Sequence, residues 1–132
     1  MIDIFSKFVW VVPLKRKTGQ EVANAFSRIL KHESFKILKL KVWVDRGKEF
    51  YYKDVQKLVA LYSTENEEKS CVIKRFNRTI KEKMFKNFSA NNTRKYVDVL
   101  DLLVDQYNNT IHSSIKMSPV EAGREVNENR VW

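Results

Sequence analysis

The chain has 132 residues, of which 43% are hydrophobic and 12% aromatic, so it can build a core and is not a disordered tail. Lysine and arginine number 25 against 16 acidic residues, and this net charge of +9 favours a polyanionic partner, most often nucleic acid, over an anionic membrane. No apolar run is long enough for a membrane span, and the single cysteine, Cys71, excludes an internal disulfide framework. We therefore expect a soluble, intracellular protein; a merely solvated basic surface is the alternative explanation of the charge.

The first third of the chain predicts an α/β arrangement. Residues 2–5 and 8–12 have the composition of two strands, joined by a tight turn, and together they predict a hairpin. Thr18 followed by Glu21 matches a capping box at the start of an amphipathic helix. The chain then returns into a short apolar strand at 42–44. Because the sequence begins inside the first predicted strand, we expect either that the start is short or that something upstream is missing.

Asp45 follows that apolar strand directly, at the polar break Asp45-Arg46-Gly47. A carboxylate at the carboxyl end of a buried strand lies where open α/β sheets bind ligands. It can therefore be a ligand or a catalyst. It can equally be a turn former that binds neighbouring backbone N–H groups, and this stretch alone favours the turn former.

The remainder of the chain predicts helices. The first covers about residues 51–60, and it is followed by a polar surface loop at 64–70, with too few residues at 61–63 for a strand. Ser70 can cap a long helix that runs to about Phe88.

Two further helices follow the long one. Asn92 or Thr93 can cap a helix to about Tyr107, and Ser118-Pro119-Val120-Glu121 is a capping box with proline at the first helical position.

The long helix carries an apolar stripe and an array of basic residues. Its apolar stripe consists of Ile73, Phe76, Ile80, Met84 and Phe88. The basic residues are Lys74, Arg75, Arg78, Lys81, Lys83 and Lys86. Such an array is often only a solvated helix face. Here a single acid, Glu82, interrupts six basic residues, so a surface that follows phosphates is at least as well supported.

Taken in chain order, the predicted strands, helices and polar loop resemble the integrase catalytic core of retroelements and related transposons, which belongs to the DDE superfamily. The matching segments are IDIFSK at 2–7 with VPL at 12–14, VDRGKEF at 44–50, RFNRT at 75–79, and the stretch from YN at 107 to SPVE at 118–121. Each segment alone is weak, but the ordered set covers nearly the whole chain. The resemblance implies an α/β, ribonuclease H-like three-layer fold, in which helices flank a mixed sheet. Residues 1–132 would form one such domain, truncated at its N-terminus so that the first, central strand is missing.

In this family three acids hold two Mg²⁺ or Mn²⁺ ions that drive polynucleotidyl transfer during DNA integration. The resemblance places the second acid on Asp45 and the third at Lys74, whereas Asp3 lies one strand too late to be the first. Lys74 also lies in the first turn of its predicted helix, where the helix dipole favours an acid. We expect this copy to be catalytically inactive and the Lys74 ammonium to lie near Asp45, in the space of a metal.

Other metal-binding residue types are interpreted as structural or solvated. Three glutamates, Glu65, Glu67 and Glu68, belong to the predicted polar loop, although one of them could replace a lost acid. His32 and His112 are interpreted as surface or turn residues, because no cysteine or histidine lies at zinc spacing from them.

DNA binding survives the loss of acids better than catalysis does. The resemblance places Asn77, Arg78 and Lys81 at positions that face substrate DNA, on the same side of the helix as Lys74. We expect contact with phosphates regardless of sequence, in the nucleus if the source is eukaryotic. Two alternatives stay open: an active integrase in a longer product, and a protein-interaction module without DNA binding. Self-association is compatible with each of these, and nothing suggests a small-molecule substrate.

Overall fold

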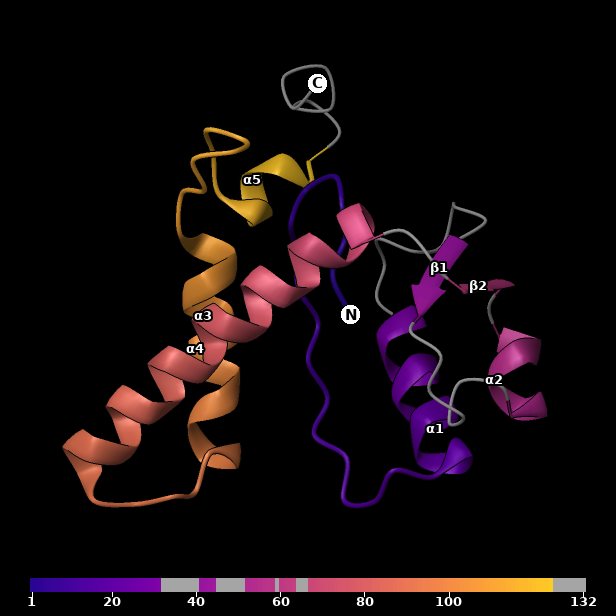
Figure 1. Cartoon of the computed structure of the whole chain (residues 1–132), viewed down its shortest axis with the longest axis horizontal. Coiled ribbons are helices and arrows are strands. Elements are labelled where there is room, and N and C mark those ends of the chain that lie inside the picture. The colour runs from indigo at the N-terminus through magenta and orange to yellow at the C-terminus, as the bar shows by residue number, and fades with distance from the viewer. Residues whose placement is uncertain (32–40, 45–51, 59, 64–66, 125–132) are drawn as a thin grey trace. The chain divides into compact units, whose positions relative to one another are not determined.

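The computed structural model describes residues 1–31, 41–44, 52–58, 60–63 and 67–124. Figure 1 shows its elements in chain order: α1 (Gly19–Leu30), β1 (Lys41–Val44), α2 (Lys53–Leu58), β2 (Ala60–Ser63), α3 (Glu67–Asn91), α4 (Val97–Asn109) and α5 (Pro119–Ala122). The chain divides into two compact units, residues 1–11 with 71–132 (unit 1) and residues 12–70 (unit 2). The single-domain organisation stays a prediction.

The predicted ribonuclease H-like fold is wrong for the described residues. They are mostly helical, and the regular sheet within these ranges is a parallel pair, β1 and β2, with Lys41 opposite Ala60 and Val44 opposite Ser63. The predicted N-terminal hairpin does form a turn, but it contributes only an isolated antiparallel bridge between Ile2 and Val9. The physical reason lies in unit 1, where residue 9 packs against helices and takes its hydrogen bonds from a side chain.

Strand β2 is a second correction, because the sequence predicts no strand at residues 61–63. Four residues, Ala60–Ser63, pair in parallel with β1, and α2 connects the two strands. Parallel strands require such a crossover, and their pairing is decided by a partner elsewhere in the chain. The short local pattern of residues 61–63 therefore carried little information about it.

Helix α1 begins as predicted, but its capping box is only half formed. The Thr18 hydroxyl accepts a hydrogen bond from the Glu21 backbone N–H at 3.4 Å. The Glu21 carboxylate accepts from the backbone N–H of Arg16 at 2.9 Å, two residues before the cap. The reciprocal bond of a capping box is thus replaced by one that holds the basic segment preceding the helix.

Gly19, the first residue of α1, is buried where α2 approaches. A Cβ atom at this position would lie 2.3 Å from Cγ and 2.7 Å from Cβ of Tyr52. Rotation of the Tyr52 side chain can displace its Cγ, but its Cβ is fixed by the backbone and cannot move away. The absence of a side chain at residue 19 is therefore required for the packing of unit 2.

We predict that Gly19→Ala lowers the free energy of unfolding by about 1–3 kcal/mol, because the added methyl group overpacks this contact. Gly123→Ala is the control, since its Cβ would lie 3.5 Å from the Pro119 carbonyl oxygen, an ordinary contact. Urea denaturation followed by circular dichroism measures both variants. Equal stability of Gly19→Ala and the parent would contradict the packing, and removal of the ring in Gly19→Ala/Tyr52→Ala should restore part of the loss.

In unit 1, Asp3 organises the N-terminal turn. Its carboxylate accepts hydrogen bonds from the backbone N–H of Phe5 at 3.2 Å and of Ser6 at 2.9 Å, and from the Ser6 hydroxyl at 2.5 Å. Lys7 takes a left-handed backbone conformation with φ 62°. Asp3 is thus a turn former, and the bonds it makes account for its carboxylate without a metal.

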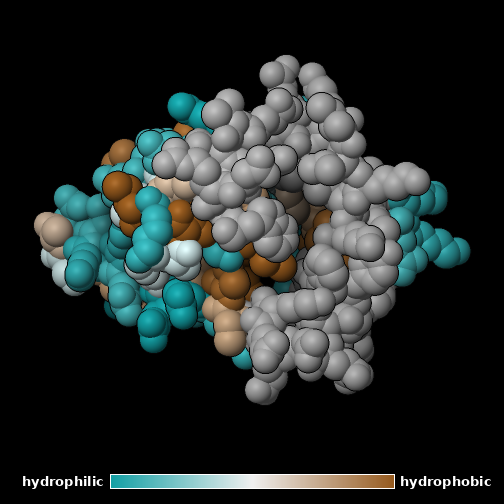
Figure 2. All heavy atoms as spheres, turned by 90° about the horizontal axis from the view of Figure 1, so that it is seen from above, coloured by the Kyte–Doolittle hydropathy of each residue, from teal (hydrophilic) through white to brown (hydrophobic). Residues whose placement is uncertain are grey.

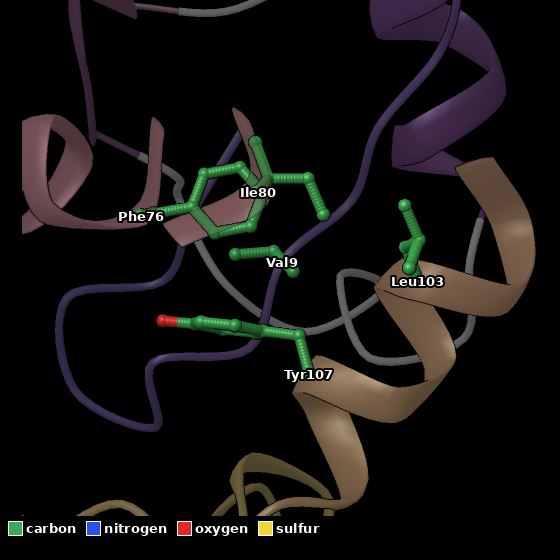
Figure 3. Packing of buried hydrophobic residues seen from close by; sticks show 5 residues of the cluster. All are labelled: Val9, Phe76, Ile80, Leu103 and Tyr107. Atoms are coloured by element: carbon green, nitrogen blue, oxygen red, sulfur yellow. The ribbon is translucent and has the colours of Figure 1, made fainter. Parts of the chain in front are cut away.

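The core of unit 1 is built by the N-terminal segment together with α3 and α4. Figure 3 shows Val9 between Phe76 and Ile80 of α3 on one side and Leu103 and Tyr107 of α4 on the other. The Phe76 and Tyr107 rings meet edge to face, with centroids 4.9 Å apart. Because α3 and α4 bury these residues, this cluster fixes which side of each helix turns inward.

Asn108 of α4 connects the N-terminal segment to this core. Its side-chain Oδ1 accepts from the Val9 backbone N–H at 2.9 Å, and its Nδ2 donates to the Val9 carbonyl at 3.0 Å. Asn108 is 5% exposed and Val9 is 1% exposed, so both bonds are shielded from water. One amide therefore satisfies both polar groups of a buried peptide residue, as a neighbouring strand would.

We predict that Asn108→Ala lowers the free energy of unfolding by about 2–4 kcal/mol, because the N–H and C=O of Val9 would both lose their partner in a buried site. Asn109→Ala is a matched control, since the Asn109 amide is exposed and bonds only to Asp105 of its own helix. Its expected effect is within about 0.5 kcal/mol. Equal losses in the two variants, measured by urea denaturation, would show that the Val9 pairing contributes nothing particular.

Helix boundaries in unit 1 differ from the predictions at α3 and α4. Asn92 does not cap α4; it takes a left-handed conformation, φ 45°, immediately after α3. The Thr93 N–H bonds to the Phe88 carbonyl at 3.3 Å, which completes a Schellman-type ending. Helix α4 starts only at Val97 and has no side-chain cap. Asparagine suits both an N-cap and a left-handed ending, so its position alone did not decide between them.

The capping box of α5 is confirmed. The Ser118 hydroxyl accepts from the Glu121 N–H at 3.3 Å, and the Glu121 carboxylate accepts from the Ser118 N–H at 3.0 Å. Pro119 occupies the first turn, as predicted, and Gly123 follows the helix. Hydrogen bonds from the backbone and then the side chain of Ser118 hold the pKa of Glu121 below its usual range.

Candidate nucleic-acid interface

Helix α3 carries the predicted site, but it begins earlier than predicted. It starts at Glu67, so Ser70 lies inside it and Lys74 lies seven residues beyond its first residue. The influence of the helix dipole is confined to about the first turn. The predicted position of Lys74 in the first turn is therefore wrong, and the helix tolerates a cation there at no cost from the dipole.

Three basic residues of α3 form one exposed stripe, which we call the basic stripe: Lys74, Arg78 and Lys81. Their spacing places the three side chains within an arc of about 60° around the helix axis. Asn77 is also exposed and lies at one edge of the stripe. The predicted placement of these four residues on one side of a helix agrees with the structure, whereas their binding role stays a prediction.

The core of unit 1 determines the outward direction of the basic stripe. Phe76 and Ile80 are buried in the cluster with Val9, on a different side of α3 from the stripe. The Thr79 hydroxyl donates to the Arg75 carbonyl at 3.1 Å, so it is satisfied within its own helix. A rotation of α3 that buried the stripe would expose this aromatic and aliphatic pair, which the hydrophobic effect opposes.

Charge is concentrated on α3 within unit 1. From Cys71 to Asn91 the helix contains six basic residues and one acidic residue, and all of the basic residues except half-buried Lys83 are exposed. Helix α4 carries the opposite charge on exposed Asp98, Asp101 and Asp105. In Figure 2 hydrophilic residues (teal) and hydrophobic residues (brown) lie next to one another at the left of the view. The net positive charge of the chain is thus not spread evenly over unit 1.

Arg75 lies beside the basic stripe and acts on α4. Burial raises the pKa of the Tyr107 phenol, and the Arg75 guanidinium opposes that shift because a nearby cation favours the phenolate. The two groups are therefore within electrostatic reach of each other, although Arg75 itself is exposed.

The metal site implied by the resemblance does not fit the described residues. At the position of the third acid the structure has Lys74, an exposed ammonium that offers no lone pair to a cation. Within residues 1–31, 41–44, 52–58, 60–63 and 67–124, no three His, Cys, Asp or Glu side chains gather where they could hold a metal ion. Asp45 lies outside the described residues, so the prediction that the Lys74 ammonium lies near Asp45 falls outside them too. We assign no metal-dependent step.

The other candidate ligands have separate outcomes. Glu67 is the first residue of α3 and Glu68 the second, so the predicted loop is wrong at these positions, while Glu65 and His32 lie outside the described residues. His112 begins a turn, as predicted: its N–H donates to the Met117 carbonyl at 3.0 Å, and its ring centroid lies 4.5 Å from that of Tyr107.

Phe85 is a candidate binding residue that the sequence pattern does not predict, since the apolar stripe of α3 includes Phe88 and leaves Phe85 without a role. In the structure Phe85 is 65% exposed, and it lies four residues beyond Lys81. The helical spacing from Lys74 through Arg78 and Lys81 could have identified it, because the same spacing continues to residue 85.

Comparison with known proteins gives one informative similarity. No family model matches the chain. The chain is 37% identical, over 128 residues, to an uncharacterized transposon-derived protein of Caenorhabditis elegans. The match covers 93% of the chain and 44% of that protein, so the chain spans less than half of its relative's length. This similarity supports a transposon origin for the chain. Separately, no helix in the described part of the chain has the length and apolar character needed to cross a membrane.

We predict that Arg75→Ala raises the pKa of Tyr107 further, because the cation that favours the phenolate is removed while burial is unchanged. Spectrophotometric titration of the tyrosine phenols measures this pKa. Subtracting the titration curve of Tyr107→Phe isolates the signal of Tyr107 from that of the other tyrosines among the five. Since the folded-state pKa is raised above the unfolded value of about 10, stability should be complete below that pH and fall as pH rises through the folded pKa. An unchanged or lowered Tyr107 pKa in Arg75→Ala would contradict the proximity.

Proposed function

We propose that the chain is a non-catalytic, DNA-binding part of a transposon-derived integrase, and that it holds the phosphate backbone with the basic stripe of α3. The observation that carries this proposal is the position of Lys74, Arg78 and Lys81: all three are exposed on one side of a helix whose other side is anchored in the core. The transposon-derived relative supports the origin. The integrase assignment and the DNA partner rest on the resemblance of the ordered sequence segments.

The dimensions of the stripe suit a polyphosphate chain. Seven residues of helix separate Lys74 from Lys81, which corresponds to about 10 Å along the axis. Double-stranded DNA carries one charge per about 1.7 Å of its axis, so a helix lying along it meets several phosphates over this length. All three side chains are exposed, so a phosphate chain can reach them from solvent. The contact would be electrostatic and independent of base sequence.

Catalysis is left out of the proposal for a chemical reason. Metal-dependent phosphodiester chemistry needs several carboxylates around the same cations, since hard ions such as Mg²⁺ are held by oxygen ligands. The resemblance assigns one of these positions to Lys74, whose ammonium repels a cation. Retention of the DNA-binding surface without the metal site is the combination that the described residues favour.

We predict that the variant Lys74→Ala/Arg78→Ala/Lys81→Ala loses most of its affinity for DNA, and that the loss is the same for DNA of any base sequence. Three fewer phosphate contacts should also flatten the dependence of log K on log salt by about 2–3 units of slope. Fluorescence anisotropy with a labelled duplex at several salt concentrations measures both quantities.

The control is Arg94→Ala/Lys95→Ala/Lys116→Ala. It also lowers the net charge of +9 by three, but at exposed positions of unit 1 outside α3. If binding depends only on overall charge, both variants weaken equally and the assignment to α3 is wrong. If the parent chain binds no DNA at low salt, the proposed function itself is wrong.

A further inference from the structure

We infer that the interface on α3 takes nucleic acid with unpaired bases, and that Phe85 is the platform on which a base stacks. This inference deepens the proposed function and rests on it. The observation behind it is that an exposed aromatic ring extends the basic stripe: Phe85 is 65% exposed and lies four residues beyond Lys81 in the same helix.

The position of Phe85 around α3 is close to that of all three cations. With 3.6 residues per turn, Phe85 lies within about 40° of Lys74, Arg78 and Lys81 around the helix axis. Its Cα is about 6 Å along the axis from that of Lys81. A nucleic-acid strand whose phosphates contact the cations would thus bring a neighbouring base to the ring. Cations that follow the backbone, together with aromatic rings that stack on bases, are the usual combination in proteins that bind single strands.

The Phe85 ring is supported from within its own helix. It meets Phe88, which is half-buried, edge to face, with centroids 6.0 Å apart. This contact supports one part of the ring, while most of the residue remains open to solvent. A partly supported ring loses less conformational freedom on binding than a free one, which favours its use as a stacking surface.

A protein partner fits this ring less well than a nucleic acid does. Exposed apolar residues often mark protein interfaces, but the stripe that leads to Phe85 consists of cations. Packing an apolar protein surface here would remove water from Arg78 and Lys81 without supplying a partner for their charges. A nucleic acid supplies phosphates for the cations and the flat face of a base for the ring. In an intact duplex the base faces are already stacked, and opening them costs free energy, so unpaired bases fit better.

The test compares a single-stranded oligonucleotide with a duplex of the same length, by fluorescence anisotropy of the full chain at one salt concentration. In Phe85→Ala we expect the dissociation constant for the single strand to rise about five- to hundred-fold, as for other stacking aromatics. The duplex constant should change by less than about twofold. Phe85→Trp, which keeps a stacking surface, should retain the affinity of the parent for the single strand.

The matched control is Leu102→Ala, which removes an exposed apolar side chain from α4, where the exposed charges are acidic. It should alter neither constant. Circular dichroism and urea denaturation of Phe85→Ala should match the parent, because the residue contributes little to the core.

Two results would overturn the inference while leaving the proposed function intact. In the first, Phe85→Ala binds single strand and duplex as the parent does, while the variant that lacks the three basic-stripe side chains binds neither. In the second, Phe85→Ala changes the sedimentation of the chain without nucleic acid, which would identify the ring as a contact between copies. If the basic-stripe variant binds as well as the parent, both the inference and the proposed function fail.

Discussion

The fold of unit 1 depends on a single amide that replaces a β-strand. Residues 1–3 lie beside the extended segment that contains Val9, through the bridge of Ile2 to Val9. The N–H and C=O of Val9 itself, however, take their hydrogen bonds from α4, so these buried groups need a side-chain partner there. Asn108 supplies one donor and one acceptor at the spacing of a peptide, and it is uncharged. Val9 can therefore enter the core between α3 and α4 at no net loss of backbone hydrogen bonds. A charged or apolar residue at 108 would leave at least one of these groups unsatisfied.

The same core sets the direction of the candidate interface. Because Val9 fills the space between α3 and α4, Phe76 and Ile80 must face it, and the rotation of α3 about its axis is determined. With 3.6 residues per turn, a shift of the buried pattern by one residue would turn every side chain by about 100°. The outward direction of Lys74, Arg78 and Lys81 is thus a consequence of packing more than of their own chemistry. Stability of the core and the proposed binding by the surface are thus linked through the rotation of α3 about its own axis.

Local signals in the sequence correctly predicted part of the fold and part of the candidate interface. The capping box at Ser118, the buried side of α3 and the exposed basic residues all depend on contacts within a few positions. What failed depends on distant partners: β2 exists because β1 pairs with it, and Val9 is satisfied by a residue 99 positions away. The strands came from local composition, and their arrangement in a mixed sheet came from the resemblance, which describes a family and not the pairings available to this chain. Asn92 failed for another reason, since asparagine is favourable at both ends of a helix.

Position 74 connects the lost chemistry to the proposed binding. An acid there, as the resemblance implies for active relatives, would lie one turn from Arg78 and two turns from Lys81, and would divide the positive surface with a negative charge. It would attract a metal ion and repel a phosphate unless the metal stood between them. A lysine in place of that acid changes the charge at position 74 from negative to positive and makes the stripe continuously positive. The residue that argues against a metal centre at position 74 is therefore the one that would strengthen direct contact with phosphate, so the proposed lack of catalysis and the proposed binding would have the same physical cause.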